Sequence, residues 1–385
     1  MLGGATTFLL NFLRALQDHR DTLRITAIAE ENEHASDFAI LGAKVSTGPV
    51  QRMIYEDRLA WAYHQVARGR PNAILACLGA ESYEILRLAP PGVVRIGLIQ
   101  SDDPLPYAMA RHYGAWTDAI VGVSSQITAR LKTLPEFEGT TLATIPYGIA
   151  FPESPARPKR ATGGPLRVIY LGRIIEEQKR ISRLAELIHL LREEPIQWTI
   201  AGSGPDEEEF RSAVAGEPRV SLLGTVANRD VPALLREHDV YILLSDYEGL
   251  PLSLLEAMGH GVVPVISDLA SGIGQAVVEG TGMRVPVGDV GAAADILRML
   301  VHNPAILANL SEAAAHHART HFSAETMASR YLELIHSLSP NPHPVWLPRV
   351  PIPTPRGVRL PWLYSGLPRH GRRWLKNLHP LKGRA

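Results

Sequence analysis

Residues 240–266 read VYILLSDYEGLPLSLLEAMGHGVVPVI, and this stretch decides the fold. Its apolar runs predict a strand over Val240–Leu244 and another over Val262–Ile266, with a helix around Leu252–Met258 between them. Two strands that are joined by a helix pair in parallel, and helices cover both faces of a parallel sheet. The stretch therefore predicts an α/β domain with a parallel sheet.

The same alternation of strands and helices continues on both sides of this stretch. Within its half of the chain, further strands are predicted at Arg167–Leu171, Ile196–Ala201 and Arg219–Leu223. Helices are predicted at Lys179–Arg192, after Pro205, at Asp230–His238, and near Ala292–Val301, Pro304–His321 and Ala324–Ser337.

The first half of the chain shows a second set of such units. Strands are predicted at Arg24–Ala29, Ala73–Leu78, Val93–Gln100 and Ala119–Val123, with a closing run at Leu142–Pro146. Helices are predicted from Gly4 to His19, near Tyr55–Arg68, after Glu81 and at Ser124–Leu134, the last capped by Ser124 or Ser125.

Composition and local sequence divide the 385 residues into two domains and a tail. Residues 152–165 are rich in proline, glycine and charge, which is typical of a linker. We predict a first domain over 1–151, a second over 166–322, a C-terminal helix over 323–338 and a tail over 339–385.

The first domain lacks an expected element at its start. A nucleotide-binding α/β half opens with a central strand that leads into a glycine turn, but only Met1 and Leu2 precede Gly3 and Gly4. We therefore expect this first strand to be missing from the sequence, because the recorded start is late or the chain is truncated. A fold that tolerates the gap is the alternative.

The charge balance and the cysteine content indicate what kind of partner and which cellular compartment to expect. The chain has 39 basic and 39 acidic residues, so no overall field favours a nucleic-acid partner. Its one cysteine, Cys77, cannot form an internal disulfide, and no signal peptide or membrane-spanning apolar run is visible. These features predict a cytoplasmic protein whose contact with a membrane, if it has one, is peripheral.

Two carboxylates bracket the start of the helix in the opening stretch. Glu248 belongs to the loop before that helix and Glu256 lies inside it, roughly 7 Å further along the axis from Pro251. They can therefore contact opposite ends of an elongated ligand such as a sugar nucleotide, whose diphosphate suits the free N–H groups of a helix start. A pair of solvated surface charges is the alternative.

A basic pair follows another strand. Arg173 closes the strand Arg167–Leu171 and Lys179 follows six residues later, beyond the carboxyl end of a parallel strand, where ligands bind open α/β sheets. A guanidinium and an ammonium group suit phosphate oxygens and can stabilise a departing diphosphate. Surface pairing with Glu176 or Glu177 is the alternative.

In this order and spacing, the motifs resemble the family 4 retaining glycosyltransferases, which have the GT-B fold. The resemblance covers the chain to about Ser337. The segments that carry it are Gly3-Gly4-Ala5-Thr6, DAIVGVS at 118–124, Ile145-Pro146-Tyr147-Gly148, Gly172-Arg173 with Lys179, AGSGP at 201–205, Leu223-Gly224-Thr225-Val226, and Glu248 with Glu256.

This resemblance implies two Rossmann-like domains whose parallel sheets face an interdomain cleft, with site residues in both. Arg173, Lys179 and Glu248 would be catalytic: the two cations hold the donor diphosphate and Glu248 contacts the transferred sugar. Glu256 would bind the ribose hydroxyls. The other donor-binding residues would be Gly3, Gly4, Gly172, Gly202, Gly204, Val226, Gly249, Leu250, Pro251 and Leu252, although Gly202 and Gly204 equally fit a structural turn.

The sequence departs from the family on the acceptor side. Many members have a histidine near the reacting sugar, whereas this chain reads Gln100-Ser101-Asp102-Asp103-Pro104. Ser101 and Asp102 are our acceptor-side candidates, with helix capping by Asp102 or Asp103 as the alternative. Tyr147 and Ala150 stand where asparagine and an acidic residue are common in the family.

The predicted activity is transfer of a sugar from a nucleotide diphosphate sugar to a saccharide or lipid-linked acceptor, with retention and with neither metal nor cofactor. Retention comes from the resemblance alone. A non-catalytic nucleotide-sugar-binding protein of the same fold is the first alternative. A phosphorylase-like enzyme is the second, but it needs a lysine for pyridoxal phosphate that the sequence does not single out.

The tail lies outside the resemblance and is strongly basic. Residues 339–385 carry a formal charge of +9 and no acidic residue, so residues 1–338 carry −9 in a chain of net charge 0. Ten prolines prevent a long helix there, and Trp346, Trp362 and Trp374 suit a lipid headgroup interface. Attachment to an anionic membrane is one hypothesis, and a disordered tail against the acidic body is the other.

Overall fold

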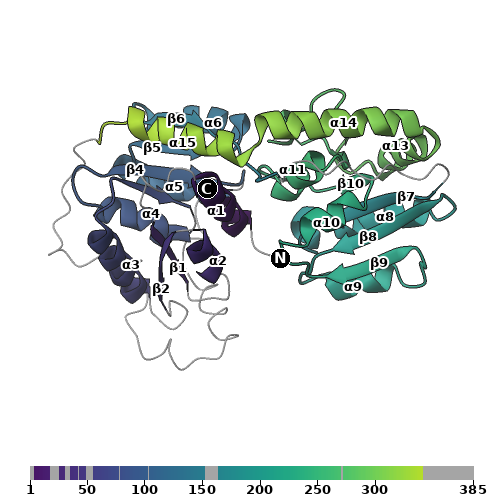
Figure 1. Cartoon of the computed structure of the whole chain (residues 1–385), viewed down its shortest axis with the longest axis horizontal. Coiled ribbons are helices and arrows are strands. Elements are labelled where there is room, and N and C mark those ends of the chain that lie inside the picture. Colours follow the sequence, from purple (N-terminus) through teal and green to yellow (C-terminus); the bar gives the residue numbers. More distant parts are fainter. Residues whose placement is uncertain are drawn as a thin grey trace.

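The computed structural model describes residues 4–17, 26–30, 35–41, 43–48, 55–77, 79–102, 104–151, 164–269 and 272–340. Figure 1 shows two α/β domains side by side, with the N-terminal part of the chain in one and residues from 164 onward in the other. The chain then returns to the first domain through its last helix.

The second domain is built on one parallel sheet of six strands in the order β12-β11-β10-β7-β8-β9. Apolar strands occupy its centre, and every residue of β10 and β11 is buried, as expected for a sheet that is covered on both faces. The strands are β7 Leu166–Leu171, β8 Ile196–Ala201, β9 Val220–Gly224, β10 Val240–Leu243, β11 Val263–Ser267 and β12 Met283–Val285.

Helices connect and cover these strands, and the last of them lies along the first domain. The helices are α7 Glu176–Lys179, α8 Ile181–Leu190, α9 Glu207–Ala213, α10 Val231–Arg236, α11 Leu252–Gly259, α12 Ile273–Ala276, α13 Val290–His302, α14 Pro304–His321 and α15 Ala324–Ser337.

The described strands of the first domain lie in two parallel sheets. One has four strands in the order β3-β4-β5-β6 and the other has two, β1 and β2. The strands are β1 Thr26–Glu30, β2 Lys44–Gly48, β3 Ala73–Ala76, β4 Val94–Ile99, β5 Ala119–Gly122 and β6 Thr141–Thr144. The helices are α1 Gly4–Ala15, α2 Ala35–Ile40, α3 Tyr55–Gly69, α4 Gly79–Leu88, α5 Pro104–Tyr113 and α6 Ser125–Lys132, with short 3-10 turns at Gly114–Trp116 and Pro135–Phe137.

Helix α15 fastens the end of the second half to the first domain. It packs along α1, where the Tyr331 ring lies 5.3 Å from that of Phe12 and 6.0 Å from that of Phe8. A β-bridge between Ile149 and Ser323 joins the chain just before α15 to the end of the first domain. The aromatic contact buries large apolar rings between α1 and α15, which holds α1 at the domain junction.

Most predicted elements are present with nearly the predicted bounds. The bounds of β8, α14 and α15 are those predicted, and Ser124 caps α6 through its side chain. The prediction missed the weakly patterned α2, β2, α12 and β12. The predicted first-domain helix is shorter, because α1 ends at Ala15.

The predicted helix Lys179–Arg192 is wrong in one respect. The chain forms the short α7, breaks at Arg180 and continues as α8. Arg180 has φ 50° and ψ 56°, a left-handed conformation that costs about 1–2 kcal/mol in a residue with a side chain. Ion pairs that Arg180 and Arg183 form with Asp246 hold this break in place.

Candidate functional site

The predicted catalytic residues meet where the carboxyl ends of central strands face the first domain. Arg173 follows β7, Lys179 ends α7, and Glu248 lies in the loop after β10. Strands β7 and β10 are hydrogen-bonded neighbours in the sheet, so the segments that follow them lie together. The structure therefore brings together three side chains that are up to 75 positions apart in the sequence.

Glu248 is a buried carboxylate with a hydrogen-bond donor on each oxygen. The Lys179 Nζ lies 2.5 Å from Glu248 Oε1, and the two side chains are only 11% and 6% exposed. The Gln178 Nε2 donates to Glu248 Oε2 at 3.4 Å and to the Tyr247 carbonyl at 3.1 Å. These contacts fix the orientation of the carboxylate and supply the partner that a buried charge requires.

Gln178 also connects Glu248 to Arg173. The Arg173 guanidinium donates to Gln178 Oε1 at 3.3 Å, while its backbone carbonyl accepts a hydrogen bond from Tyr170. Arg173 is exposed at the surface of the site, in contrast to Lys179. The sequence prediction missed Gln178, whose position one residue before Lys179 was the only signal of its role.

Because the helix breaks at Arg180, side chains on the two sides of the break contact different partners. Lys179 and Gln178 face Glu248, whereas Arg180 and Arg183 pair with Asp246, two residues before Glu248. The Asp246 backbone N–H also donates to the Gln178 carbonyl at 3.0 Å. Burial opposes ionisation of Asp246, but the hydrogen bonds from both arginines keep its pKa below the usual range. The loop that carries Glu248 is thus tied to α7 and α8.

The glycines after β7 and β8 pack against each other. A Cβ on Gly202 would lie 1.7 Å from the Gly172 carbonyl oxygen, and Gly202 has φ +146°. A Cβ on Gly204 would lie 1.9 Å from the Ile174 carbonyl oxygen. No side chain fits at either position. Both glycines therefore allow close packing of the backbone at residues 172–174, the segment that includes Arg173. This favours the structural turn that the sequence left open, and it leaves their predicted contact with a donor as a prediction.

The loop 248–251 also touches the first domain. A Cβ on Gly249 would lie 2.5 Å from the Gln100 carbonyl oxygen and 3.2 Å from Ser101 Cα, at the end of β4. Gly249 in turn accepts a hydrogen bond from the Gly272 N–H, and the Ser125 N–H donates to Gln275 of α12. Ser101, an acceptor-side candidate, therefore lies directly against the loop that carries Glu248.

Three side chains of the first domain contact Asp102, the other acceptor-side candidate. Its carboxylate accepts hydrogen bonds from Tyr107 at 2.6 Å, Gln126 at 3.3 Å and Arg130 at 3.1 Å. The donors are side chains of α5 and α6, so the described contacts of Asp102 join two helices rather than cap one. Asp103, the alternative cap, lies outside the described residues, as does Gly3.

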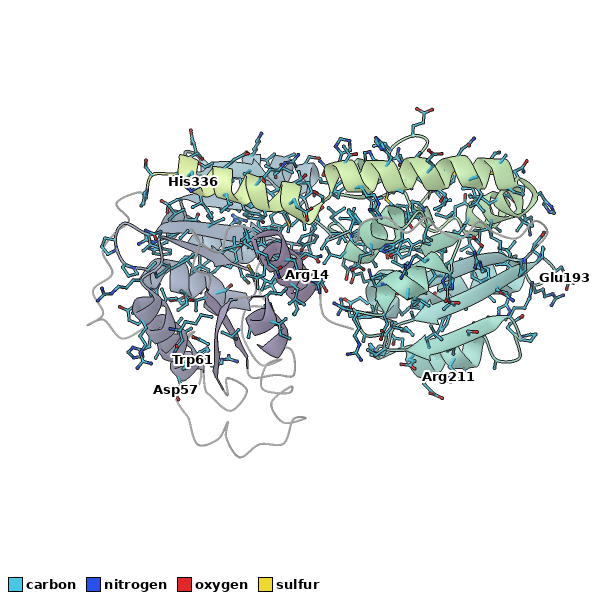
Figure 2. All side chains as sticks on the ribbon, in the orientation of Figure 1. Arg14, Asp57, Trp61, Glu193, Arg211 and His336 are labelled. Atoms are coloured by element: carbon cyan, nitrogen blue, oxygen red, sulfur yellow. The ribbon has the colours of Figure 1, made fainter. Side chains whose placement is uncertain are left out.

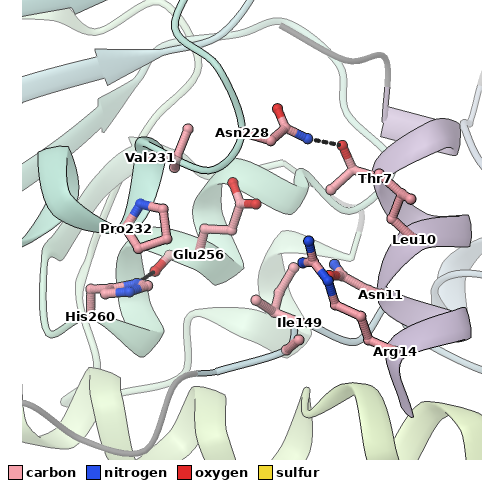
Figure 3. A pocket seen from close by; sticks show the side chains of 11 residues that line it. Thr7, Leu10, Asn11, Arg14, Ile149, Asn228, Val231, Pro232, Glu256 and His260 are labelled. Carbon is pink, nitrogen blue, oxygen red and sulfur yellow. Dashed lines mark hydrogen bonds between the residues drawn. The ribbon is translucent and has the colours of Figure 1, made fainter. Parts of the chain in front are cut away.

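Glu256 occupies a pocket between the two domains (Figure 3). The pocket is also lined by Asn228 and His260 of the second domain and by Asn11 and Arg14 of α1. Thr7 of α1 accepts a hydrogen bond from the Asn228 side chain at 3.2 Å, which joins the domains across the pocket.

The other predicted donor-binding residues lie near this pocket in the sequence. Gly4 begins α1, and Val226 lies two residues before Asn228. Leu250, Pro251 and Leu252 lead into the helix that carries Glu256.

Ligand-free Glu256 should destabilise the fold above neutral pH. Burial raises the pKa of its carboxyl to about 7, partly offset by Arg14, whereas the unfolded chain titrates near 4.5. An acid whose pKa is raised on folding costs no stability below the unfolded pKa of 4.5. The cost grows as pH rises from there to the folded pKa of about 7, and it stays constant above that. We expect the glutamine variant Glu256→Gln to exceed the wild type in free energy of unfolding at pH 8 by on the order of 2–3 kcal/mol. Urea unfolding at pH 4.5 and pH 8 should show this difference at pH 8 alone, and a difference independent of pH would contradict it.

Among the described residues, no group of three or more His, Cys, Asp or Glu side chains is arranged to hold a metal ion. Within the same residues, no helix is long and apolar enough to cross a membrane.

Comparison with known proteins identifies the architecture. The family model described as Glycosyl transferases group 1 matches residues 165–303. The structure of HepE from Anabaena in complex with UDP-glucose superposes with a TM-score of 0.70 at 17% identity, over 88% of this chain and 97% of that one. The chain has the GT-B fold. This confirms the predicted fold class, with parallel-sheet domains on either side of the site.

Two curated relatives each match less than half of the chain. The putative colanic acid biosynthesis glycosyltransferase WcaL of Escherichia coli is 32% identical over 168 residues, 40% of this chain and 41% of the relative. The amylovoran biosynthesis glycosyltransferase AmsK of Erwinia amylovora is 29% identical over 187 residues, 46% of each chain. The chain thus spans less than half the length of these relatives. Both matches support the glycosyltransferase family rather than one member of it.

Proposed function

We propose that the protein is a glycosyltransferase that moves a sugar from a nucleotide diphosphate sugar to a saccharide or lipid-linked acceptor. The observation that carries this proposal is the buried pair Lys179–Glu248 beside exposed Arg173, at a point where the loop after β10 touches the end of β4. In the proposed reaction, these positive groups stabilise the charge that develops on the departing diphosphate. The names of WcaL and AmsK, both assigned to polysaccharide biosynthesis, support a sugar acceptor.

The proposed reaction breaks the bond between the anomeric carbon and the diphosphate oxygen and forms a bond to an acceptor hydroxyl oxygen. The acceptor's proton passes to the departing phosphate, so no separate base is required. A double displacement would need Glu248 as nucleophile. Both oxygens of Glu248 already accept hydrogen bonds from Lys179 and Gln178, which lowers its nucleophilicity and favours the direct route. Retention of configuration and independence of metal and cofactor belong to this proposal.

A screen of nucleotide sugars tests the function. Binding of UDP-glucose, GDP-mannose and ADP-glucose to the full chain is measured by calorimetry, since UDP-glucose is bound by the structural neighbour HepE. The sugar that binds is then incubated with the protein, and free nucleotide diphosphate is measured with and without EDTA. We expect slow hydrolysis that EDTA does not change. Failure of all three sugars to bind would contradict the proposal, and loss of hydrolysis in EDTA would contradict metal independence.

A second candidate is a nucleotide-sugar-binding protein without transferase activity. It is favoured by one observation: Asp102, at the position of the acceptor-side candidates, is held by three donors within the first domain. The hydrolysis assay separates the two functions. Tight binding of a nucleotide sugar with no release of nucleotide, even with a mixture of saccharide acceptors, would identify the binding protein.

Attachment of the basic tail to an anionic membrane is a further part of the proposal. Residues 341–385 lie outside the described residues, so the prediction rests on the +9 charge of 339–385. Each basic residue near an anionic surface contributes about 1 kcal/mol, and salt screens the attraction. We expect the full chain to sediment with phosphatidylserine liposomes at low salt and to be released at high salt, unlike a 1–338 truncation. Equal sedimentation of the two chains would contradict the prediction.

A further inference from the structure

The pocket around Glu256 contains polar groups that protein atoms leave unsatisfied. The Asn11 Nδ2 and the His260 Nε2 are buried, and neither has a hydrogen-bond partner among the described residues. Asn11 is 4% exposed and His260 is 8% exposed. A buried polar atom without a partner costs about 1–3 kcal/mol, so a native pocket that holds two of them indicates a ligand or ordered water.

The two unsatisfied atoms have complementary chemistry. The His260 Nδ1 lies 2.8 Å from the Glu256 carbonyl oxygen, which can only accept, so Nδ1 carries the proton and Nε2 is an acceptor. Burial keeps the pKa of His260 below its ordinary value, so the ring is neutral at pH 7. The Asn11 Nδ2 is a donor. Together with the Glu256 carboxyl, the pocket therefore offers both donors and acceptors, as a hydroxylated ligand requires.

The size of the pocket limits what enters it. Its volume is about 60 Å³. On this measure one water molecule needs roughly 10–15 Å³, so the pocket takes a few water-sized groups and not a whole nucleoside. Two neighbouring hydroxyls on a larger ligand match both this volume and the hydrogen-bonding groups.

The wall opposite Glu256 belongs to the first domain. Asn11 and Arg14 are on successive turns of α1, and Figure 3 shows both side chains extending from α1 toward the side of the pocket where Glu256 lies. Figure 2 places Arg14 at the junction between the domains. The positive charge of Arg14 acts on the Glu256 carboxyl, and the hydrogen bond between Thr7 and Asn228 closes one side. A ligand at Glu256 is therefore enclosed by both domains.

We propose that this interdomain pocket receives the cis-diol of the donor's ribose, and that Asn11, Arg14 and His260 bind it together with Glu256. This inference rests on the proposed function and on the predicted contact of Glu256 with the ribose hydroxyls. It adds that α1 of the first domain recognises the nucleotide, so that a ribonucleotide is preferred over a deoxy analogue.

The test compares nucleotides with and without the diol. The full chain is titrated with UDP, GDP and ADP, and the nucleotide that binds most tightly is compared with its 2′,3′-dideoxy analogue. The variants are Asn11→Leu, which keeps the shape of the side chain, and Arg14→Met, which keeps its length. Arg68→Met, at another arginine in the last turn of a first-domain helix, is the matched control.

We expect Asn11→Leu and Arg14→Met each to weaken binding of the ribonucleotide about tenfold, and the dideoxy analogue much less, as for loss of one hydrogen bond to a charged or buried group. Arg68→Met should bind both as the wild type does. Wild-type affinities in both variants, or equal losses for the two nucleotides, would overturn the inference. Arg14 is exposed, so its variant tests the proposal even if Asn11→Leu fails to fold.

Glu256→Gln separates this inference from the function itself. If Glu256→Gln weakens binding while the α1 variants do not, the ribose site is confined to the second domain and only the inference is wrong. If Glu256→Gln binds as the wild type, the predicted ribose contact of Glu256 is wrong as well. If none of the three nucleotides binds the wild type, the proposed function itself is wrong.

Discussion

Replacing Arg173 with alanine is expected to lower turnover by roughly 10²–10³-fold and to leave the melting temperature at the wild-type value. The loss of turnover follows from removal of one preorganised positive group beside the departing diphosphate. Stability should not change, because Arg173 is exposed and its guanidinium has one hydrogen bond, to Gln178, among the side-chain contacts that the structure describes.

Replacing Lys179 with alanine is expected to lower turnover at least as much and also to destabilise the fold. Lys179 is the ion-pair partner of buried Glu248, and removal of one member of such a pair costs about 3–5 kcal/mol. The double variant Lys179→Met with Glu248→Gln removes both charges. It should regain most of the lost stability and none of the lost turnover.

Steady-state rates of donor turnover and thermal unfolding of the same samples check these expectations. Arg192→Ala is the control, because Arg192 is an exposed arginine after α8, away from the strand ends that carry the site. It should match the wild type in both measurements. Near-wild-type rates for Arg173→Ala and Lys179→Ala would remove the two residues from the site, whatever the stabilities show.

The arrangement of Arg173 and Glu248, both predicted to be catalytic, could be predicted from the sequence because it follows from the sheet. Arg173 and Glu248 each follow a strongly apolar strand, and the ends of parallel neighbours meet at one edge. The ion pair between Lys179 and Glu248 could not be predicted. The apolar pattern continues from Lys179 into α8, so nothing in it signals the left-handed residue Arg180 that turns Lys179 toward Glu248.

The contacts between the domains could not be predicted from the sequence either. Asn11 and Arg14 look like ordinary residues of an amphipathic helix, and their role depends on how α15 fixes α1 at the junction. The hydrogen bonds of Asp102 could not be predicted for the same reason, since its donors Gln126 and Arg130 are 24 and 28 positions away. Pairing over such distances is set by packing, which local patterns do not encode.

Gly249 brings the loop that carries Glu248 against the backbone of Gln100 and Ser101 in the first domain. A substitution there tests the contact between the domains and leaves every charged side chain of the candidate site unchanged. The missing side chain of Gly249 leaves room for the backbone of Gln100 and Ser101. These neighbours are main-chain atoms at the end of a buried strand, so they cannot move aside as a flexible side chain can. An alanine at 249 must therefore push the first domain away from the loop that carries Glu248.

Gly249→Ala is expected to lower transfer to an acceptor by about 10²-fold, because a displacement of roughly 1 Å between reacting groups costs that much. Nucleotide affinity should fall by no more than the roughly tenfold expected for a lost α1 contact, since Arg173, Lys179 and Glu256 all belong to the second domain. The matched control is Gly274→Ala in nearby α12, where an added Cβ meets only Arg284 at 3.7 Å. Calorimetry and transfer rates on both variants decide the question. If Gly249→Ala transfers sugar as fast as Gly274→Ala, close contact between this loop and the end of β4 is not required for the reaction.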